Sequence, residues 1–536
     1  MGGARGRGVY DGRVYQSLLT RKYLTSKLMP ILAMLAVMLS VATILITWSV
    51  MGGFLKTLVN SGRALVGDVV VTWPNVGFPY YEDLASRLED EGMIEAAAPM
   101  IETFGLVKLP DDRIELITIK GIEPQSYMRV TNYADTIWWK PLEAPTPKDD
   151  AREDPRLAPE FRGAMERFEE RARRLSRVDP DTGERVPAGV LGVEVTGLNI
   201  RTEEGFYDIR DSGLRARPDG GVERVPGFMP AGGRVGLTVL ALDSSGRPVD
   251  PVTRTIPIVN EFQSGIYEID TSTVFVPLDL LQRMLRLDEA RRVEAPRDDN
   301  PFGVTTDPET GESAPARRAV VGVDPARVTS VLVRGADGVP VDRVRDRAHE
   351  IYEAFAADHA GEVPTGRQMG RQIRTWEDLN ATMINAVKKE TGLVLFVFGI
   401  ISFTSVFLVL SIFWSMVSEK TKDIGILRAL GASTPGIAWL WIRYGTVIGL
   451  IGAVLGSVAG YLVVSNINGI HDWLGRTFGL VIWDPRQYYF IEIPSEVEVS
   501  KLVIVFVVGV LTCVLGSLIP AWRSARMDPV KALRFE

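Results

Sequence analysis

The chain has 536 residues, of which 46% are hydrophobic and 24% are charged, and its net charge is −7. These values exclude a small binding module and a disordered polymer, and the negative charge argues against a nucleic-acid binder. One cysteine, Cys513, and three scattered histidines exclude a disulfide framework and a cysteine- or histidine-rich metal site.

Four stretches of the chain contain no charged residue: 28–55, 391–418, 444–471 and 502–522. At about 1.5 Å per helical residue, each is long enough to cross a hydrocarbon core of roughly 30 Å. The apolar part of the first stretch is longer than the core of a signal peptide, and buried helices of soluble proteins rarely lack charge over such lengths. We therefore expect four transmembrane helices.

Lysine and arginine beside these spans predict the orientation of the chain. Six basic residues and one acidic residue precede the first span. Basic residues also outnumber acidic ones between spans two and three and after span four, whereas the connection 466–500 is acidic. Because basic flanks stay on the cytoplasmic side, we expect both termini in the cytosol and the mass between spans one and two outside.

That mass contains about 340 residues, enough for one large or two small domains. Strands are predicted where β-branched or alternating residues run together, at 68–73, 113–122, 233–243 and 328–335. Helices are predicted from apolar periodicity at 80–92, 278–290 and 341–356. The expected fold is a four-transmembrane-helix bundle with a large α+β extracytoplasmic domain between helices 1 and 2.

Two stretches of this domain, 141–187 and 291–318, are rich in proline and charged residues and predict exposed insertions, with a partner-binding arm as the alternative. Apolar spacing after Met51 and from Trp376 to Val387 predicts that spans one and two continue as helices outside the bilayer. Two continuous helices would carry movement between membrane and domain.

The predicted organisation follows from these boundaries. In chain order it comprises a cytoplasmic segment 1–27, helix 28–55, the extracytoplasmic domain 56–390, helix 391–418, a cytoplasmic segment 419–440, helix 441–465, an outer loop 466–500, helix 501–522 and a cytoplasmic tail 523–536.

Several kinds of chemistry have no signature in the sequence. The chain contains no G-x-x-x-x-G-K-[ST], no H-E-x-x-H and no G-x-S-x-G. The four uncharged stretches provide no Asp, Glu, Lys or Arg for a proton relay or ion site inside the bilayer. We therefore expect no catalytic residues, no metal and no cofactor in this chain, and energy for any work must come from another protein.

Span three contains five glycines at spacings of three or four residues: Gly445, Gly449, Gly452, Gly456 and Gly460. Small residues on one face of a membrane helix let a second helix approach closely. This pattern fits packing within the bundle and a seam between subunits equally well.

The cytoplasmic stretch SEKTKDIGILRALGAS, residues 418–433, predicts a short helix that ends at Gly431. One interpretation is an interfacial turn whose apolar side faces lipid headgroups. The other is a coupling helix whose apolar side chains enter a groove on a cytoplasmic motor.

This stretch, the glycine-rich span after it and the ending IPAWRSARMDPVKALRFE (519–536) resemble the FtsX/MacB-type permeases of ABC transporters. The resemblance extends to the Lol lipoprotein-releasing permeases. It is carried there by SVMGGF (49–54), SGIYEIDTSTVFVPLDLLQRML (264–285), TWEDLNATMINAVKKE (375–390) and WDPRQYYFIEIPSEVEVS (483–500).

The resemblance implies an inner-membrane complex that contains two permease subunits and a separate ATPase, which binds ATP and Mg. The second permease subunit would be another copy of this chain or a paralogue. Such complexes lift lipoproteins from the membrane and pass them to a periplasmic carrier. The residues that would contact the ATPase are Glu419, Lys420, Asp423, Ile424, Leu427, Arg428 and Gly431.

Some Lol permeases recruit their carrier through a hairpin, and the turn at 243–255 has a similar place in this chain. Its candidate carrier-binding residues are Gly246, Arg247, Pro248 and Val249, although a plain hairpin turn has the same composition. Two further functions share the architecture: a MacB-like efflux component, which usually carries a fused ATPase domain, and an FtsX-like regulator of cell-wall hydrolases, which usually has a smaller external domain.

Overall fold

Two compact units make up the chain. The helical unit comprises Met1–Thr57, Thr382–Asp484 and Glu492–Glu536, and the sheet unit comprises Leu58–Ala381 and Pro485–Ile491. The computed structural model describes residues 28–63, 65–142, 154–202, 206–208, 212–216, 222–242, 247–293, 304–306, 313–315, 320–480 and 493–533.

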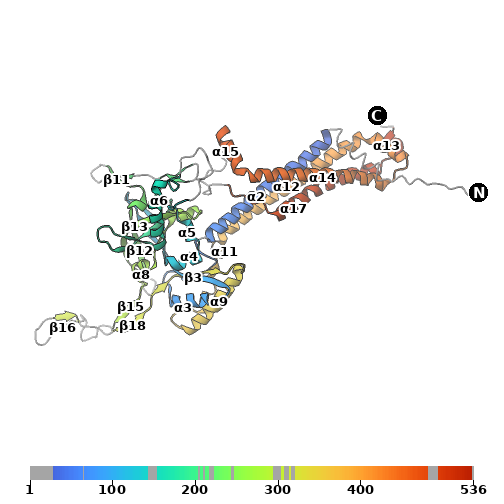
Figure 1. The fold of residues 1–536 in the computed structure, drawn as a ribbon. Helices are drawn as coiled ribbons and strands as arrows, with labels where there is room; N and C mark the ends of the chain where they lie inside the picture. Colours follow the sequence, from blue (N-terminus) through green and yellow to red (C-terminus); the bar gives the residue numbers. More distant parts are fainter. Residues whose placement is uncertain are drawn as a thin grey trace, which may run out of the picture. The chain divides into compact units, whose positions relative to one another are not determined.

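Four long apolar helices form the helical unit within the described part of the chain. They are α2 (Leu28–Arg63), α12 (Ala381–Glu419), α14 (Thr434–Ser465) and α17 (Val499–Ala525). Each is long and apolar enough to cross a membrane, as the uncharged runs predicted. Figure 1 shows these helices side by side, with the short helix α13 (Thr421–Ala429) at one end and α15 (Ile467–Phe478) at the other.

Spans one and two both continue as helices beyond their uncharged stretches, since α2 runs to Arg63 and α12 begins at Ala381. The expected helix before span two is nevertheless interrupted, because its first turn is separate from α12. Helix α11 (Trp376–Leu379) ends at Asn380, where the backbone leaves the helical region, and α12 begins at the next residue. The Asn380 amide donates to the Trp376 carbonyl at 3.1 Å, so its side chain closes α11. Asparagine bonds readily to nearby backbone, which favours ends of helices over their interiors.

The largest sheet of the sheet unit has nine described strands. In spatial order they are β12 (Arg234–Leu242), β13 (Pro248–Phe262), β7 (Gly189–Gly192), β14 (Thr273–Pro277), β4 (Ile114–Ile122), β3 (Ile94–Lys108), β20 (Ser330–Gly335), β1 (Val69–Thr72) and β21 (Ile373–Thr375). The strands predicted at 68–73, 113–122, 233–243 and 328–335 correspond to four of them.

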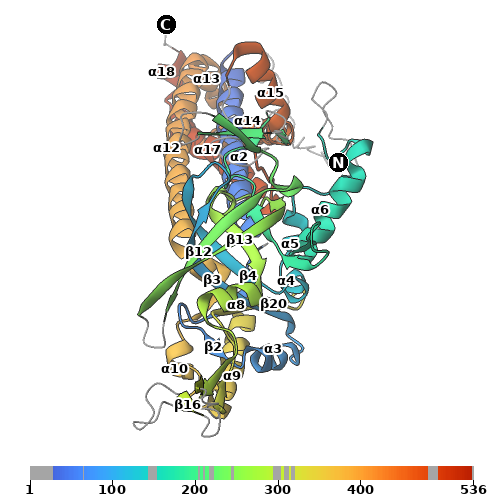
Figure 2. The same cartoon turned by 90° about the vertical axis from the view of Figure 1, so that its left-hand side faces the viewer.

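Strand β3 pairs with two different strands along one of its edges. Its first half pairs with β20, from Ile94 to Met100, and the residues from Gly105 to Lys108 pair with β12. Along its other edge, Met100 to Lys108 pair with β4. The pairing of β3 with β12 therefore closes the first six strands of the order, from β12 to β3, into a ring. The remaining strands β20, β1 and β21 extend from this ring. Figure 2 shows β3, β4, β12 and β13 together on one side of the sheet unit.

The extension of the sheet is buried on both faces. In β1, Val69 and Val71 join one hydrophobic cluster and Val70 joins another. The helices α3 (Tyr81–Glu89) and α9 (Val341–Asp358) contribute to the first cluster, and α4 (Pro124–Val130) contributes to the second. A strand covered on both sides reads as a continuous apolar run, which explains the VVV sequence.

Many described residues of the first predicted insertion are exposed, but one side of it packs against the rest of the sheet unit. Its described part contains α6 (Arg162–Arg174), in which Met165 and Ala172 are buried. Leu175, which follows the helix, is also fully buried. Met165, Phe168, Ala172 and Leu175 recur at helical spacing among many charges, so a narrow apolar stripe suffices to dock the helix. Residues 143–153 and most of 291–318 lie outside the described residues.

A buried polar cluster joins β13 to the segment before the first insertion. The Asn260 amide donates to the Trp139 carbonyl at 2.9 Å and accepts from the Trp139 backbone N–H at 3.1 Å. The Trp139 indole donates to Glu261 Oε2 at 2.7 Å. Burial raises the pKa of the Glu261 carboxyl from 4.5 to about 7, against the lowering effect of its hydrogen bonds.

Replacing Glu261 should change how stability depends on pH. The raised pKa means that the folded state binds more protons than the unfolded state between pH 4.5 and about 7. The free energy of unfolding therefore falls as pH rises through this window, by at most about 3.5 kcal/mol at about 1.4 kcal/mol per pKa unit. Glu261→Gln keeps an acceptor for Trp139 and should remove this contribution.

The measurement is thermal unfolding of the purified wild type and variant at pH 5 and pH 8. The variant should gain stability relative to wild type at the higher pH. If the unfolding temperatures of the two proteins changed equally with pH, the raised pKa of Glu261 would be contradicted.

Candidate functional site

Helix α13 connects α12 and α14 and ends in a well-defined cap. The Ala432 N–H donates to the Leu427 carbonyl at 3.0 Å, and the Gly431 N–H donates to the Arg428 carbonyl at 3.1 Å. Gly431 has φ of +95°, in the left-handed region that glycine enters without steric cost. These two bonds and the glycine form a Schellman motif, which explains why the helix stops where the sequence predicted.

The apolar side chains of α13 point in two directions. Ile424 is 3% exposed and belongs to the buried cluster of the helical unit, whereas Leu430 is 81% exposed and Ile426 is 49% exposed. Leu427 is half-buried. The exposed pair Ile426 and Leu430, four residues apart on one side, was not among the contact residues predicted from the sequence. In the sequence, only the i, i+4 spacing of these two apolar residues indicated a shared helix face. The same spacing also occurs on helix faces that are buried, so it does not identify an exposed pair.

The charged residues predicted to contact a partner also bond within the chain. Lys420 Nζ lies 2.9 Å from Asp423 Oδ2. Arg428 Nη1 donates to the Ala432 carbonyl at 3.1 Å and to Thr434 Oγ1 at 3.0 Å. Arg428 thus ties α13 to the first turn of α14. Glu419 is the last residue of α12.

The short helix α18 (Pro529–Leu533) packs against α13. Its Ala532 is 2% exposed, whereas Val530 is 63% exposed. Two short helices therefore form one surface at this end of the bundle, with apolar side chains on each. The apolar side chains of such a surface can insert into a hydrophobic groove on a partner protein.

The glycines of α14 lie against two different helices. A Cβ atom added at Gly445 or Gly449 would lie 2.6 Å from Ser517 Oγ or 2.7 Å from Cys513 Cβ, both on α17. The other three glycines lie against α2. An added Cβ would be 3.0 Å from Met34 O at Gly452, 2.6 Å from Met38 O at Gly456 and 3.0 Å from a Leu45 methyl at Gly460. All five glycines thus contact helices of the same chain.

The candidate carrier-binding turn joins β12 to β13. These strands are antiparallel and their last pair is Leu242 with Pro248. Arg247 and Pro248 are exposed and Val249 is half-buried, whereas Gly246 lies outside the described residues.

Near this hairpin the outward sides of β3, β4 and β12 are apolar. Leu106 and Leu116 are partners in the ladder and are 42% and 68% exposed. The remaining exposed apolar side chains are Phe104, Ile114 and Leu240. Contiguous apolar side chains on a water-facing strand surface mark interaction sites.

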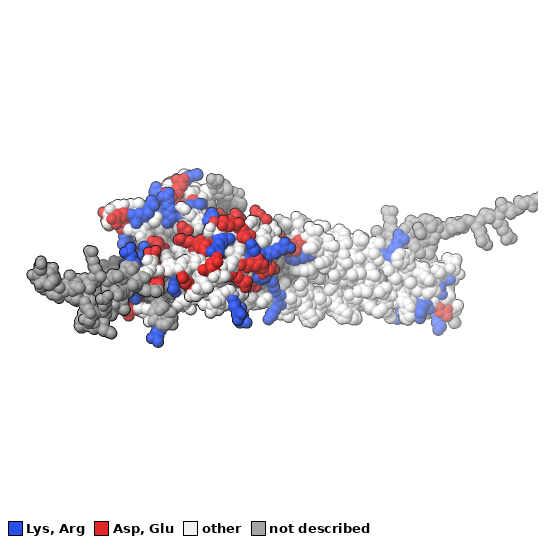
Figure 3. All heavy atoms as spheres, turned by 90° about the horizontal axis from the view of Figure 1, so that it is seen from below, with Lys and Arg blue, Asp and Glu red and all other residues white. Residues whose placement is uncertain are grey.

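The face of the helical unit in Figure 3 carries almost no charge along its side, whereas the sheet unit is covered with both signs. A long surface without charged side chains is suited to lipid, because a charge in the hydrocarbon region is costly.

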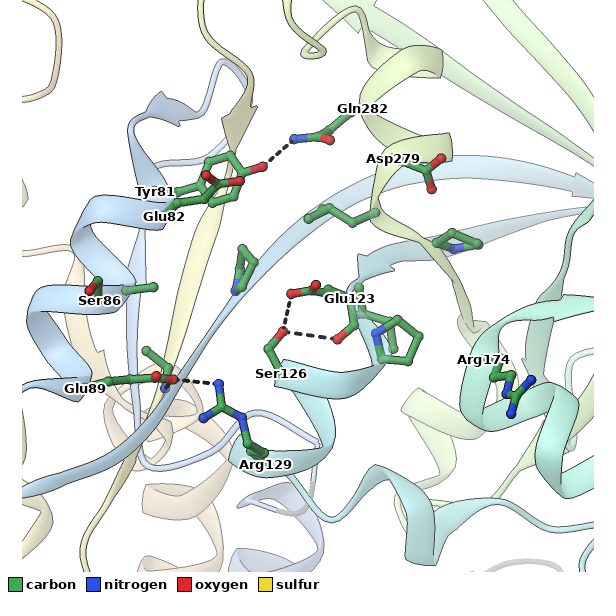
Figure 4. A pocket seen from close by; sticks show the side chains of 17 residues that line it. Tyr81, Glu82, Ser86, Glu89, Glu123, Ser126, Arg129, Arg174, Asp279 and Gln282 are labelled. Atoms are coloured by element: carbon green, nitrogen blue, oxygen red, sulfur yellow. Dashed lines mark hydrogen bonds and ion pairs between the residues drawn. The ribbon is translucent and has the colours of Figure 1, made fainter.

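A groove of about 630 Å³ lies in the sheet unit between α3, α4 and α8 (Leu278–Leu285). Figure 4 shows Glu89 and Arg129 facing each other across it, and their ion pair measures 2.8 Å. Glu89 also accepts from the Ala97 backbone N–H at 3.0 Å, and Ser126 donates to Glu123 at 2.8 Å. These polar groups join α3, α4 and β3 to one another.

Part of the helical unit matches a known protein family. Residues 395–529 match the family described as FtsX-like permease C-terminal. The chain is also 27% identical over 196 residues to the lipoprotein-releasing system transmembrane protein LolC of Xylella fastidiosa, which is 37% of this chain and 47% of that protein. This confirms the resemblance to FtsX/MacB-type permeases close to the Lol group.

The transmembrane protein LolE of Haemophilus influenzae is 29% identical over 117 residues, which is 22% of this chain and 28% of that protein. These matches thus span about half, or less, of the relatives' length. The periplasmic region of MacB from Actinobacillus actinomycetemcomitans aligns with 62% of this chain and 98% of its own, with a TM-score of 0.26 and 10% identity.

A substitution in the glycine face of α14 should weaken the helical unit. Gly456→Ala would place a Cβ 2.6 Å from a backbone oxygen of α2, so the helices must separate. We expect a loss of about 1–3 kcal/mol, the usual cost of overpacking. Gly399→Ala in α12 is the matched control, because an added Cβ there meets nothing within 4 Å.

Thermal unfolding of both variants in the same detergent measures the effect. Only Gly456→Ala should unfold at a lower temperature than wild type. Equal midpoints for the two variants would refute this role of the glycine face.

Proposed function

We propose that this chain is a permease subunit of an ABC transporter that uses a separate ATPase to extract lipoproteins from the inner membrane and deliver them to a periplasmic carrier. The observation that carries the proposal is α13 itself. It lies between two spans, within the segment that matches the FtsX-like family, and exposes Ile426 and Leu430 at the end of the bundle. The names of the LolC and LolE relatives supply the substrate class.

The proposed orientation places α13, α18 and both termini in the cytoplasm and the sheet unit in the periplasm. It rests on the basic residues that flank the spans on the α13 side and on the acidic connection between α14 and α17.

In this scheme the ATPase receives α13 in a groove. Ile426 and Leu430 would enter it as apolar anchors, with Val530 of α18 beside them. Ile424 would not touch the ATPase, because it already packs against the spans. The ATP and Mg belong to the partner, and this chain supplies the connection between the partner's movement and the bilayer.

The work to be done is large enough to require such a motor. Each acyl CH₂ that leaves the membrane costs about 0.8 kcal/mol, so a lipidated anchor with two or three chains does not leave unaided at useful rates. A second permease, a copy or a paralogue, would complete the assembly. The exposed apolar strands β3, β4 and β12, beside the turn at Arg247–Val249, offer a surface for the lipidated substrate and its carrier.

The first test concerns ATP hydrolysis by the purified chain. We expect none from this chain alone in detergent or nanodiscs, and hydrolysis once the cognate ATPase is co-expressed and co-purified, because the sequence contains no G-x-x-x-x-G-K-[ST] motif. Phosphate release measures both preparations. Turnover by the chain alone, with a contaminating ATPase excluded by mass spectrometry, would contradict the scheme.

The second test concerns the anchor on α13. Leu430→Asp should abolish both co-purification of the ATPase and lipoprotein release, because burying an unpaired carboxylate in an apolar groove is costly. Val323→Asp is the control, since Val323 is 54% exposed on β18 (Val320–Asp324) of the sheet unit. Membrane insertion of both variants should be normal. Normal ATPase capture by Leu430→Asp would show that α13 is not the coupling site.

A further inference from the structure

Helix α15 follows α14 after a single residue, Asn466, and turns away from its axis. At about 100° per residue, Ile467, Ile470, Leu474 and Phe478 fall on one side of the helix. Asn468, Asp472 and Arg476 fall on the opposite side. The helix is therefore amphipathic, with His471 and Trp473 at the two edges of its apolar side.

The apolar side of α15 is only partly covered in the described structure, because Ile467 and Leu474 are half-buried whereas Ile470 and Phe478 are exposed. No residue of α15 is buried, and Phe478 on the apolar side and Trp473 at its edge are 61% and 57% exposed. Their rings contact each other edge to face at 5.6 Å. Aromatic side chains of this kind concentrate where a membrane meets water.

Contacts at the start of α15 fix its depth. Asn468 Oδ1 accepts from the Ile493 N–H at 2.8 Å, just before α17. The neighbouring segment bonds to α2, where the Glu496 N–H donates to the Ser49 carbonyl at 3.2 Å. These bonds place the first turn of α15 near the level of Ser49 in α2 and near the start of α17.

Charged side chains at that end mark the boundary of the hydrocarbon. Lys56 pairs with Glu496 at 2.6 Å, and Lys501 pairs with Glu498 at 2.7 Å. Lys501 also lies 6.0 Å from the centre of the Trp48 ring. Charges are stable in the headgroup layer and costly inside the bilayer, so this level is the membrane surface.

We propose that α15 lies flat in the headgroup layer, with Ile470, Leu474 and Phe478 buried in lipid and Asp472 and Arg476 facing water. The lipid is the occupant because the helix continues from a membrane span and begins at the level of the charged pairs. Asp472 and Arg476 balance each other, so insertion of apolar side chains provides the attraction and zwitterionic lipid suffices. The helix then holds the end of α14 at a fixed depth.

Site-specific labelling of the full-length chain tests this placement. The only native cysteine, Cys513, is buried and is replaced by alanine. Leu474→Cys and Arg476→Cys are each labelled with the fluorophore NBD and reconstituted in phosphatidylcholine vesicles. The label at 474 should emit at shorter wavelength, lose emission with doxyl-labelled lipid and resist iodide. The label at 476 should be quenched by iodide and should show much less quenching by doxyl lipid.

Added salt should leave both patterns unchanged. Equal iodide quenching at the two positions would overturn the proposal, because α15 would then lie in water. A label at 474 that resists both quenchers would also overturn it, because protein would cover the helix. If the alanine background fails to insert, the same labels in wild-type background serve, with unlabelled Cys513 checked by mass spectrometry.

Discussion

The close approach of α14 to both of its neighbours is the constraint on which the helical unit depends. Within a bilayer, lipid is as apolar as the side chains, so helices associate through tight van der Waals packing at small residues. Two glycines of α14 face α17 and three face α2. The same helix is therefore the shared partner of two others, and a displacement of α14 must move both.

This arrangement gives α13 a mechanical route into the bundle. Arg428 bonds to Thr434 at 3.0 Å, and Ser433 accepts from the Gly436 N–H at 3.2 Å, so the connection between α13 and α14 has little slack. Ile424 packs into the same cluster as Trp441 of α14. A push on the exposed pair Ile426 and Leu430 would thus reach α14 and, through its glycines, α2. Rigid elements transmit such movements, whereas flexible linkers absorb them.

Local patterns in the sequence predicted the elements but not their long-range partners. Absence of charge was enough to find four spans, and β-branched runs were enough to find β1, β4, β12 and β20. The closed ring depends on β3 pairing with β12 along the same edge that pairs with β20, which no local pattern encodes. Likewise, Ile424 and Ile426 are equally apolar, and only the position of the spans decides that the first is buried.

The left-handed Gly431 limits how the loop between α12 and α14 can vary in length. Each residue added to a helix rotates all later side chains of that helix by about 100°. An insertion within α13 would swing Leu430 toward the lipid or the spans, while Gly431 would no longer fall where the chain reverses. The number of residues in this loop therefore sets the direction of Leu430, so exchange of a side chain disturbs the loop less than insertion or deletion of a residue.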